Sequence, residues 1–347
     1  MRRKRIWLLA AVIAVAVLSG CQLGYYGQAI KGHWSLMSKR QPVADALADP
    51  ATPQRVRDNL RLAEEVLDFA ADRMGLPARG VYRQYVALES RAVVWNLMAA
   101  PAFSLTPETW CYPFAGCVSY RGYFDREAAL RAARDLDEQG FDTYVGGAAA
   151  YSTLGWFNDP LTTPMMNRSR ADMVDLLLHE LVHRRLYVKG DTRFNESLAT
   201  MVAREGTTRF LAGHDLAVDL ERWRDVDRAR AAFLAMVADT RAALTRLYAT
   251  DVPARTMTER KDRLIGQLRQ RYQSERRQLP ALDAYQGFFQ GPLNNAQLNG
   301  VGDYYGLVPA FQALLLGCGG HWHCFWEQVE RLADDPRARR RWQQEIP

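Results

Sequence analysis

A pair of histidines one helical turn apart, inside an apolar run, constrains this chain more than any other feature. The run "DLLLHELVHRRL", residues 175–186, contains two of the six histidines, His179 and His183, with Glu180 beside the first. On an α-helix, side chains four residues apart project from one face, so both imidazoles can reach a single ion. Two imidazoles and a carboxylate are costly to bury in apolar surroundings unless they bind a partner such as a cation. The run therefore predicts a buried helix that carries a metal site.

The spacing His-Glu-x-x-His is the pattern of zinc hydrolases. A catalytic zinc takes three protein ligands and keeps one position for water. Glu196 is the predicted third ligand, because it lies thirteen positions after His183, in "NESLAT" at the start of the next helix. The motif variant with a histidine six positions after His183 fails, since Lys189 stands there. We expect His179, His183 and Glu196 to bind one Zn²⁺ ion.

The predicted chemistry is hydrolysis of an amide bond. Glu180 lies on the ligand side of the helix without being a ligand, so its carboxylate can act as general base toward a zinc-activated water. Asp175, one turn before His179, is a candidate to orient that imidazole, and is equally explained as an exposed acid. Tyr304, with Tyr305 as its substitute, is a candidate to stabilise the oxyanion. Asn294 and Asn295 are candidates to bind the substrate backbone. Packing or turn formation explains each of these residues equally well.

The N-terminus predicts export and a lipid anchor. Basic residues at positions 2–5 precede an apolar run at 6–18, whose thirteen residues are too few for a bilayer core that needs about 20. Such a run fits a signal peptide, residues 1–20. "LSGC" then resembles the bacterial lipobox, so the mature chain is expected to begin at a lipidated Cys21 on a membrane facing the periplasm, with an uncleaved anchor as the alternative. Gln22 is not acidic and favours the outer membrane.

The cysteines predict disulfides. Without Cys21, four of the five cysteines remain, and an even set in an oxidising compartment indicates two bridges. Four cysteines allow three connectivities, of which pairing within each segment is the most economical: Cys111 with Cys117, and Cys318 with Cys324. Metal binding by "CGGHWHC" is the competing interpretation, because two histidines, His321 and His323, lie between its thiols.

Hydrophobic periodicity predicts a mostly helical α+β fold with a small N-terminal sheet, and the metal motif indicates that this fold is of zincin type. The chain has 347 residues, 48% of them hydrophobic, enough for one large core. The stretch 24–43, "GYYGQAIKGHWSLMSKRQPV", is predicted to be extended. The mature chain, 21–347, is expected to be a single domain of four parts: a strand-containing part at 21–168, metal-binding helices at 169–212, a helical hairpin at 213–280 and a helical part at 281–347.

Nucleic acid is not an expected partner. The net charge of +6 comes from basic residues spread over segments that also carry many acids. The long charged helices expected within 217–278 are better explained as solvated surfaces than as a binding patch. The expected partners are a peptide or protein substrate and the membrane that holds the lipid anchor.

Several blocks of the sequence, including the metal motif, resemble over nearly the full mature length a family of bacterial lipoproteins predicted to be zinc aminopeptidases. The blocks are "GYYGQAIKG", "WCYPFAGCVSYRGYF", "AYSTLGWFNDPL", "LLHELVH", "FNESLA" and "LNNAQL", with Tyr304 before "LVPAF". Many hydrolases share the zinc motif alone, whereas the blocks together are specific. The resemblance implies the ligands His179, His183 and Glu196, with Glu180 as base.

Other functions stay open at the level of the sequence. An aminopeptidase recognises a free α-ammonium, normally with carboxylates, and the usual signature Gly-x-Met-Glu-Asn is absent. "GGAAAYSTLGW" stands where zincins have the edge strand that pairs with peptide backbone, and no acid follows until Asp159. A zinc endopeptidase or an amidase acting on peptidoglycan stem peptides is therefore an alternative. A non-catalytic envelope lipoprotein with a structural zinc site is an alternative of another class, against which the general base Glu180 argues.

Overall fold

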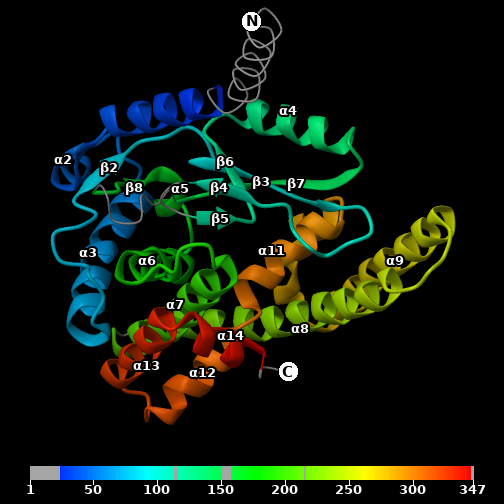
Figure 1. Ribbon diagram of the computed structural model, residues 1–347. Coiled ribbons are helices and arrows are strands. Elements are labelled where there is room, and N and C mark those ends of the chain that lie inside the picture. The colour runs from blue at the N-terminus through cyan, green and yellow to red at the C-terminus, as the bar shows by residue number, and fades with distance from the viewer. Residues whose placement is uncertain (1–23, 113–115, 151–157, 215, 345–347) are drawn as a thin grey trace, which may run out of the picture.

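Helices predominate in the computed structural model, which describes residues 24–112, 116–150, 158–214 and 216–344. Figure 1 shows an unlabelled dark-blue helix and α4 (Arg126–Asp137) along the top, small sheets beneath them, and most of the remaining helices below. The predicted fold class, α+β and mostly helical, is confirmed. The predicted signal peptide and Cys21 lie outside the described residues. Among the helices that are described, none combines the length and apolar character needed to cross a membrane.

The strands of the described residues form three small sheets. The largest is antiparallel, in the order β6 (Arg121–Tyr123), β3 (Val94–Pro101) and β7 (Phe141–Ala148). The second has the order β1 (Gln41–Pro42), β2 (Gln84–Val86) and β8 (Leu161–Thr162), and the third is the hairpin of β4 (Trp110–Tyr112) and β5 (Gly116–Val118). The strand β7 is thus an edge strand of its sheet.

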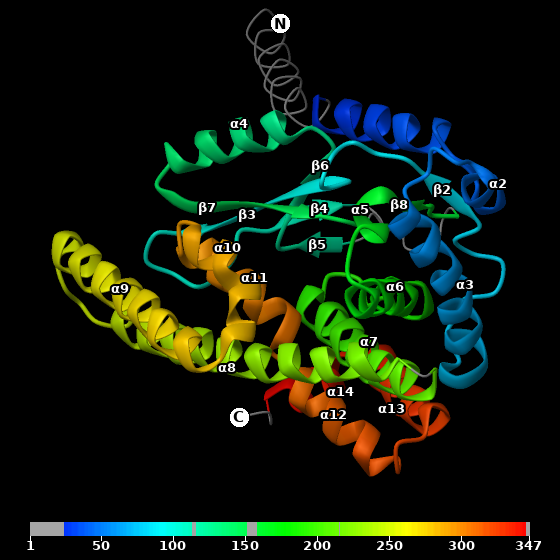
Figure 2. The same cartoon turned by 180° about the vertical axis from the view of Figure 1, so that it is seen from behind.

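The helices form a body below the sheets and a projecting hairpin. The body contains α3 (Gln54–Met74), α6 (Arg170–Arg185) and α7 (Thr192–Gly213), while the short α2 (Val43–Ala48) and α5 (Thr163–Met166) lie level with the sheets. Its C-terminal part contains α11 (Asn295–Tyr305), α12 (Val308–Gly317), α13 (Trp322–Asp334) and α14 (Pro336–Gln344). The hairpin of α8 (Ala217–Tyr248) and α9 (Ala254–Gln278) extends to one side in both Figure 1 and Figure 2, and the short η1 (Pro280–Tyr285) and α10 (Gln286–Gln290) follow it.

The prediction of an extended stretch after the signal peptide is wrong. Residues 24–38 form a helix, here called the N-terminal helix, which lies on the outer side of the sheets. Three glycines made this segment a poor helix candidate in the sequence. Gly32 has a packing role instead, because a Cβ at this position would lie 2.2 Å from Cγ of Phe124. Tertiary contact with the sheet therefore outweighs the weak local propensity.

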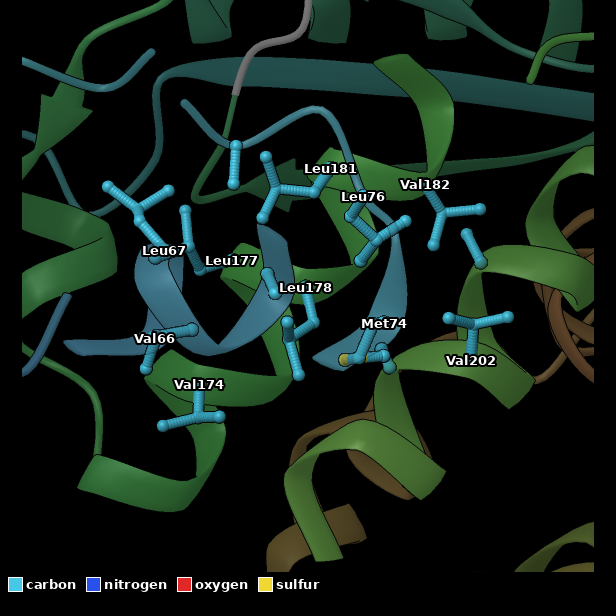
Figure 3. Packing of buried hydrophobic residues seen from close by; sticks show 14 of the residues in the cluster. Val66, Leu67, Met74, Leu76, Val174, Leu177, Leu178, Leu181, Val182 and Val202 are labelled. Carbon is cyan, nitrogen blue, oxygen red and sulfur yellow. The ribbon is translucent and has the colours of Figure 1, made fainter. Parts of the chain in front are cut away.

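The metal-motif helix α6 is buried between α3 and α7. Leu177, Leu178 and Leu181 are fully buried, and Figure 3 shows them facing α3 and α7. Gly206 of α7 permits the close approach, since a Cβ there would lie 2.8 Å from Cδ1 of Leu178 and 2.5 Å from Cε of Met74. Side chains on nearly every side of α6 thus remove it from water and fix the position of its two histidines.

Truncating this core is expected to destabilise the fold. The substitution Leu178→Ala should lower the free energy of unfolding by about 2–5 kcal/mol, because it removes a buried side chain and leaves a cavity between three helices. Denaturant unfolding of the two proteins measures the difference. Leu316→Ala is the matched control, since Leu316 is 77% exposed and its loss should change stability by less than about 0.5 kcal/mol. Equal effects of the two substitutions would contradict the packing described here.

Candidate metal centre

Two consecutive helices bring the predicted ligands together. His179 and His183 lie on α6 and Glu196 lies on α7. Nε2 of His179 is 3.1 Å from Nε2 of His183 and 3.2 Å from Oε2 of Glu196. Nε2 of His183 is 3.5 Å from the same oxygen. The three donor atoms therefore form a nearly equilateral triangle, and the group can hold a metal ion.

The size of this triangle fits a tetrahedral ion. Zinc binds imidazole nitrogen and carboxylate oxygen at about 2.0–2.2 Å, so tetrahedral ligand atoms lie about 3.3–3.6 Å apart. The three separations of 3.1, 3.2 and 3.5 Å are close to that range. The donor set of two histidines and one glutamate is also that of several catalytic zinc sites. The residues present therefore fit the ion that the sequence predicts.

The turn between the two helices is held by its own side chains. The Asn195 side chain accepts a hydrogen bond from N–H of Val188 and donates one to the carbonyl of Val188, both at 2.8 Å. Asp191 caps α7 by accepting from N–H of Phe194, and Arg339 of α14 pairs with the same carboxylate at 3.0 Å. Gly190 takes a positive φ of 77° in this turn. These contacts place Glu196 opposite the two histidines.

Opposite charges and burial both act on the ligands. Burial alone would raise the pKa of Glu196, but the charges and hydrogen bonds of His183 and His179 hold that pKa well below its usual value. Burial would lower the pKa of His179, and the hydrogen bond and charge of Glu196 outweigh it and raise that pKa. The site thus keeps Glu196 as a carboxylate, the form in which it binds a cation.

Glu180 lies beside the ligands without joining them. It is half-buried and lines the same cavity as His179 and His183. Burial raises the pKa of Glu180, while the two histidines act in the opposite direction. Behind it, Arg184 and the buried Asp159 form an ion pair of 3.5 Å. A carboxylate with a raised pKa next to a metal site is suited to accept and return a proton near neutral pH.

An aromatic wall faces the metal ligands across a cavity of about 310 Å³. Tyr304 lies on the ligand side, with its ring stacked on His179 at a centroid distance of 6.0 Å and an angle of 18°. The other aromatic residues of the cavity were not predicted as site residues, although three of them lie in the aromatic-rich stretch 81–124: Tyr25, Tyr112, Tyr120, Phe124 and Tyr187. Burial raises the pKa of Tyr120, and the charges of Glu196 and Glu180 add to it. Aromatic rings thus form much of the cavity lining, and its other polar side chains are Asn96, Glu180 and the three ligands.

Three of the other predicted residues lie away from this cavity. Tyr305 points from α11 toward Arg230 and lines a separate groove with Pro309. Asn294 caps α11 and donates to the carbonyl of Thr143. Asn295 is fully buried; it accepts from the hydroxyl of Tyr248 and donates to the carbonyls of Pro101 and Ala102. Both asparagines fasten α11 to β3 and β7, so the expectation that they bind substrate does not agree with their contacts.

Asp175 interacts with His179 by charge. Together with Glu196 and Glu180, it contributes to the raised pKa of His179. Burial raises the pKa of Asp175 itself, and the Arg230 guanidinium and His179 oppose that rise. Oδ1 of Asp175 has no hydrogen-bond partner among the described residues. The fixed hydrogen bond that an orienting role requires is therefore not formed by this oxygen.

The four remaining cysteines pair within their own segments. Cys111 is bonded to Cys117 across the β4–β5 hairpin, and Cys318 to Cys324 at the start of α13. The second bond removes both thiols of "CGGHWHC" as metal ligands, and His323 of this segment is exposed. Within the described residues, only one group of three or more His, Cys, Asp or Glu side chains could hold a metal ion, and it consists of His179, His183 and Glu196. The competing metal interpretation of this segment is wrong.

Fold and site together define a class of protein, that of mostly helical α+β proteins with two histidines and one glutamate placed so that they could hold a metal ion. The chain belongs to the family described as "Putative aminopeptidase", whose model matches residues 24–343. Membership of this family supports peptidase activity in general. The search of curated proteins and the search of solved structures each gave no match.

Proposed function

We propose that this protein is a zinc-dependent peptidase that acts as an aminopeptidase on peptides in the periplasm. The observation that carries the proposal is the triangle of His179, His183 and Glu196 with Glu180 beside it. A structural zinc site normally fills its fourth position with a protein ligand. Here the three ligands line a cavity, which leaves room for a water molecule and a substrate next to them.

The proposed mechanism assigns a role to each polar group of the site. His179, His183 and Glu196 would hold a zinc ion, which supplies a Lewis acid to the reaction. Glu180 takes the proton from the attacking water and returns it to the leaving amine. The phenol of Tyr304, on the ligand side of the cavity, donates a hydrogen bond to the oxyanion that forms at the scissile carbonyl. The aromatic wall excludes bulk water and binds the side chain of the substrate.

Removing the phenolic hydroxyl tests the role of Tyr304. The substitution Tyr304→Phe is expected to lower kcat by about 10²–10³-fold and to leave KM nearly unchanged, because the hydrogen bond acts in the transition state. Steady-state kinetics on a chromogenic peptide measures both constants. The matched control is Tyr305→Phe on the same helix, which does not line the cavity and should retain activity. Equal losses in the two variants would assign the effect to packing of α11.

An endopeptidase is the second candidate, favoured by the charges around the cavity. An aminopeptidase needs a carboxylate for the α-ammonium group of its substrate. Among the described residues that line the cavity, the carboxylates are Glu180 and Glu196, both assigned to other roles. Asp159, the nearest acid suggested by the sequence, is buried and paired with Arg184. Edge strand β7 could align a peptide backbone in either case.

A peptide panel separates the two candidates. Peptides with a free N-terminus and their N-acetylated counterparts are incubated with the purified protein, whose metal content is measured beforehand. An aminopeptidase cleaves only the free peptides and releases single N-terminal residues. Equal cleavage of the blocked peptides would reject the aminopeptidase assignment in favour of an endopeptidase. Absence of zinc after purification, with no uptake when zinc is added, would reject both.

We also propose that lipidation of Cys21 anchors the protein to a membrane facing the periplasm, and that this is the outer membrane. The support is the lipobox-like "LSGC" after the apolar run, with Gln22 at the next position. Mass spectrometry of the mature N-terminus is expected to find an acylated Cys21. An N-terminus that is neither cleaved before Cys21 nor acylated would overturn this assignment.

A further inference from the structure

The N-terminal helix carries an exposed apolar stripe. Tyr26, Ile30 and Trp34 are 36%, 69% and 74% exposed, and their spacing of four residues puts them on one face of the helix. Among the described residues, the other large hydrophobic side chains exposed to this degree are the isolated Val218 and Leu316. Three of these five exposed hydrophobic side chains thus lie on one helix. Such a concentration is typical of an interaction surface.

The opposite face of the same helix is firmly held by the protein. Leu36 is buried in a cluster with Val86, Val93 and Val94. The Gln28 side chain donates to the carbonyl of Gly122 at 3.4 Å and accepts from N–H of Phe124 at 3.2 Å. Because the helix is fixed on the sheet by these contacts, Tyr26, Ile30 and Trp34 are held outward at a defined position.

A third side of this helix borders the metal cavity. Tyr25 and Ala29 line the cavity that contains His179 and Glu196. The Tyr25 hydroxyl accepts a hydrogen bond from the hydroxyl of Tyr112 at 3.3 Å, and the Arg121 guanidinium lies 3.9 Å from the Tyr25 ring centroid. Whatever binds the exposed stripe therefore lies next to one wall of the candidate active site.

We infer that this stripe, made of Tyr26, Ile30 and Trp34, binds the surface of a phospholipid bilayer. Tyrosine and tryptophan are the residues preferred at the membrane–water interface, because each combines an apolar ring with a polar atom. Exposed cationic side chains on the helix and just after it, Lys31, Lys39 and Arg40, complement anionic headgroups.

The size of the stripe and the sequence before it favour lipid over protein as the occupant. A stable protein interface buries roughly 800 Å² per partner, which three side chains on one helix cannot supply. The sequence that precedes the helix is an apolar run followed by Cys21, three positions before residue 24. An interfacial helix next to a lipid chain gives the second signal that stable membrane attachment requires. Because Tyr25 and Ala29 of this helix line the cavity, the cavity is then held close to the bilayer.

Photolabelling of the full chain in liposomes tests this surface. The liposomes contain phosphatidylethanolamine, phosphatidylglycerol and a phospholipid with a photoreactive diazirine on its acyl chain, and mass spectrometry locates the label. Tyr26, Ile30 and Trp34 are expected to take up about tenfold more label than Val218 and Leu316, because only the helix enters the lipid. The comparison is matched, since Val218 is 67% and Leu316 is 77% exposed.

A pair of variants makes the result specific. Ile30→Ser combined with Trp34→Ser should reduce labelling of the helix by about tenfold, because both apolar contacts are lost, whereas Leu316→Ser should leave it unchanged. Unfolding curves check that each variant is folded. The inference would be overturned if the helix took up no more label than Val218 and Leu316. The inference rests on the proposed membrane location and extends it. Because photolabelling needs no substrate, the membrane-binding inference can fail while the peptidase assignment stands, and the peptidase assignment can fail while the inference stands.

Discussion

Replacing Glu180 with glutamine is expected to reduce kcat/KM by about 10²–10⁴-fold, the usual contribution of a general base, while one zinc ion stays bound. Glutamine has nearly the same size and cannot accept the proton from water. Because Glu180 is not one of the three side chains that can hold the ion, His179, His183 and Glu196 still form the complete ligand set. Peptide hydrolysis and metal content, measured on the same preparation, give the two readouts.

The control for this substitution is Glu65→Gln on the exposed side of α3. It removes one carboxylate of the same type that is not part of the cavity lining, and it should leave both readouts at the wild-type level. Retention of full activity by the Glu180→Gln variant would remove Glu180 from the mechanism. Loss of zinc together with activity would instead show that Glu180 acts as a ligand.

Replacing Glu196 with alanine is expected to abolish both metal binding and hydrolysis. Removing even an outer partner of a metal ligand costs about 10–100-fold in affinity, so removing the ligand itself should cost more than about 100-fold. The two imidazoles left on α6 cannot complete the three-ligand set that holds a catalytic zinc. Calorimetric titration of the metal-free protein with zinc measures the affinity directly.

Thermal unfolding gives an independent test of the same substitution. A ligand that binds only the folded state stabilises it by about 4 kcal/mol at a thousandfold excess over its Kd. Zinc should therefore raise the Tm of the wild-type protein and leave that of Glu196→Ala almost unchanged. Glu205→Ala on the same helix α7 is the control, because Glu205 pairs with Arg209 and is not part of the metal-binding group. A zinc-dependent rise in Tm of the Glu196→Ala variant would reject Glu196 as a ligand.

Local sequence signals predicted the part of the site that lies on consecutive helices. The apolar run around His179 required a buried helix, and the fixed rise and turn of an α-helix then placed His183 beside it. Glu196 was within reach because one short turn joins the helices. The cysteine pairs were also predictable, since each bond closes a loop within one short segment. In each case the partners are neighbours along the chain, so their geometry follows from local structure.

The N-terminal helix shows where local signals are insufficient. Its glycines lower helix propensity, and the sequence alone predicted an extended segment. The helix forms because Leu36 enters a core with β2 and β3, and because Gly32 allows contact with Phe124. The partners of these residues lie far away in the sequence, and propensity carries no information about them.

The sequence by itself determined the chemistry of the centre: the identity of the three side chains that can hold an ion, the adjacent carboxylate and the helices that carry them. Only the tertiary structure decided what surrounds the centre. It brought Tyr25, Tyr120 and Tyr304 to one cavity, and it turned Tyr305 and Asn295 away from that cavity. The physical reason is that helix geometry fixes the relative positions of side chains that are a few residues apart. A cavity wall depends instead on packing between segments separated by about a hundred residues or more, and no periodicity in the sequence encodes that packing.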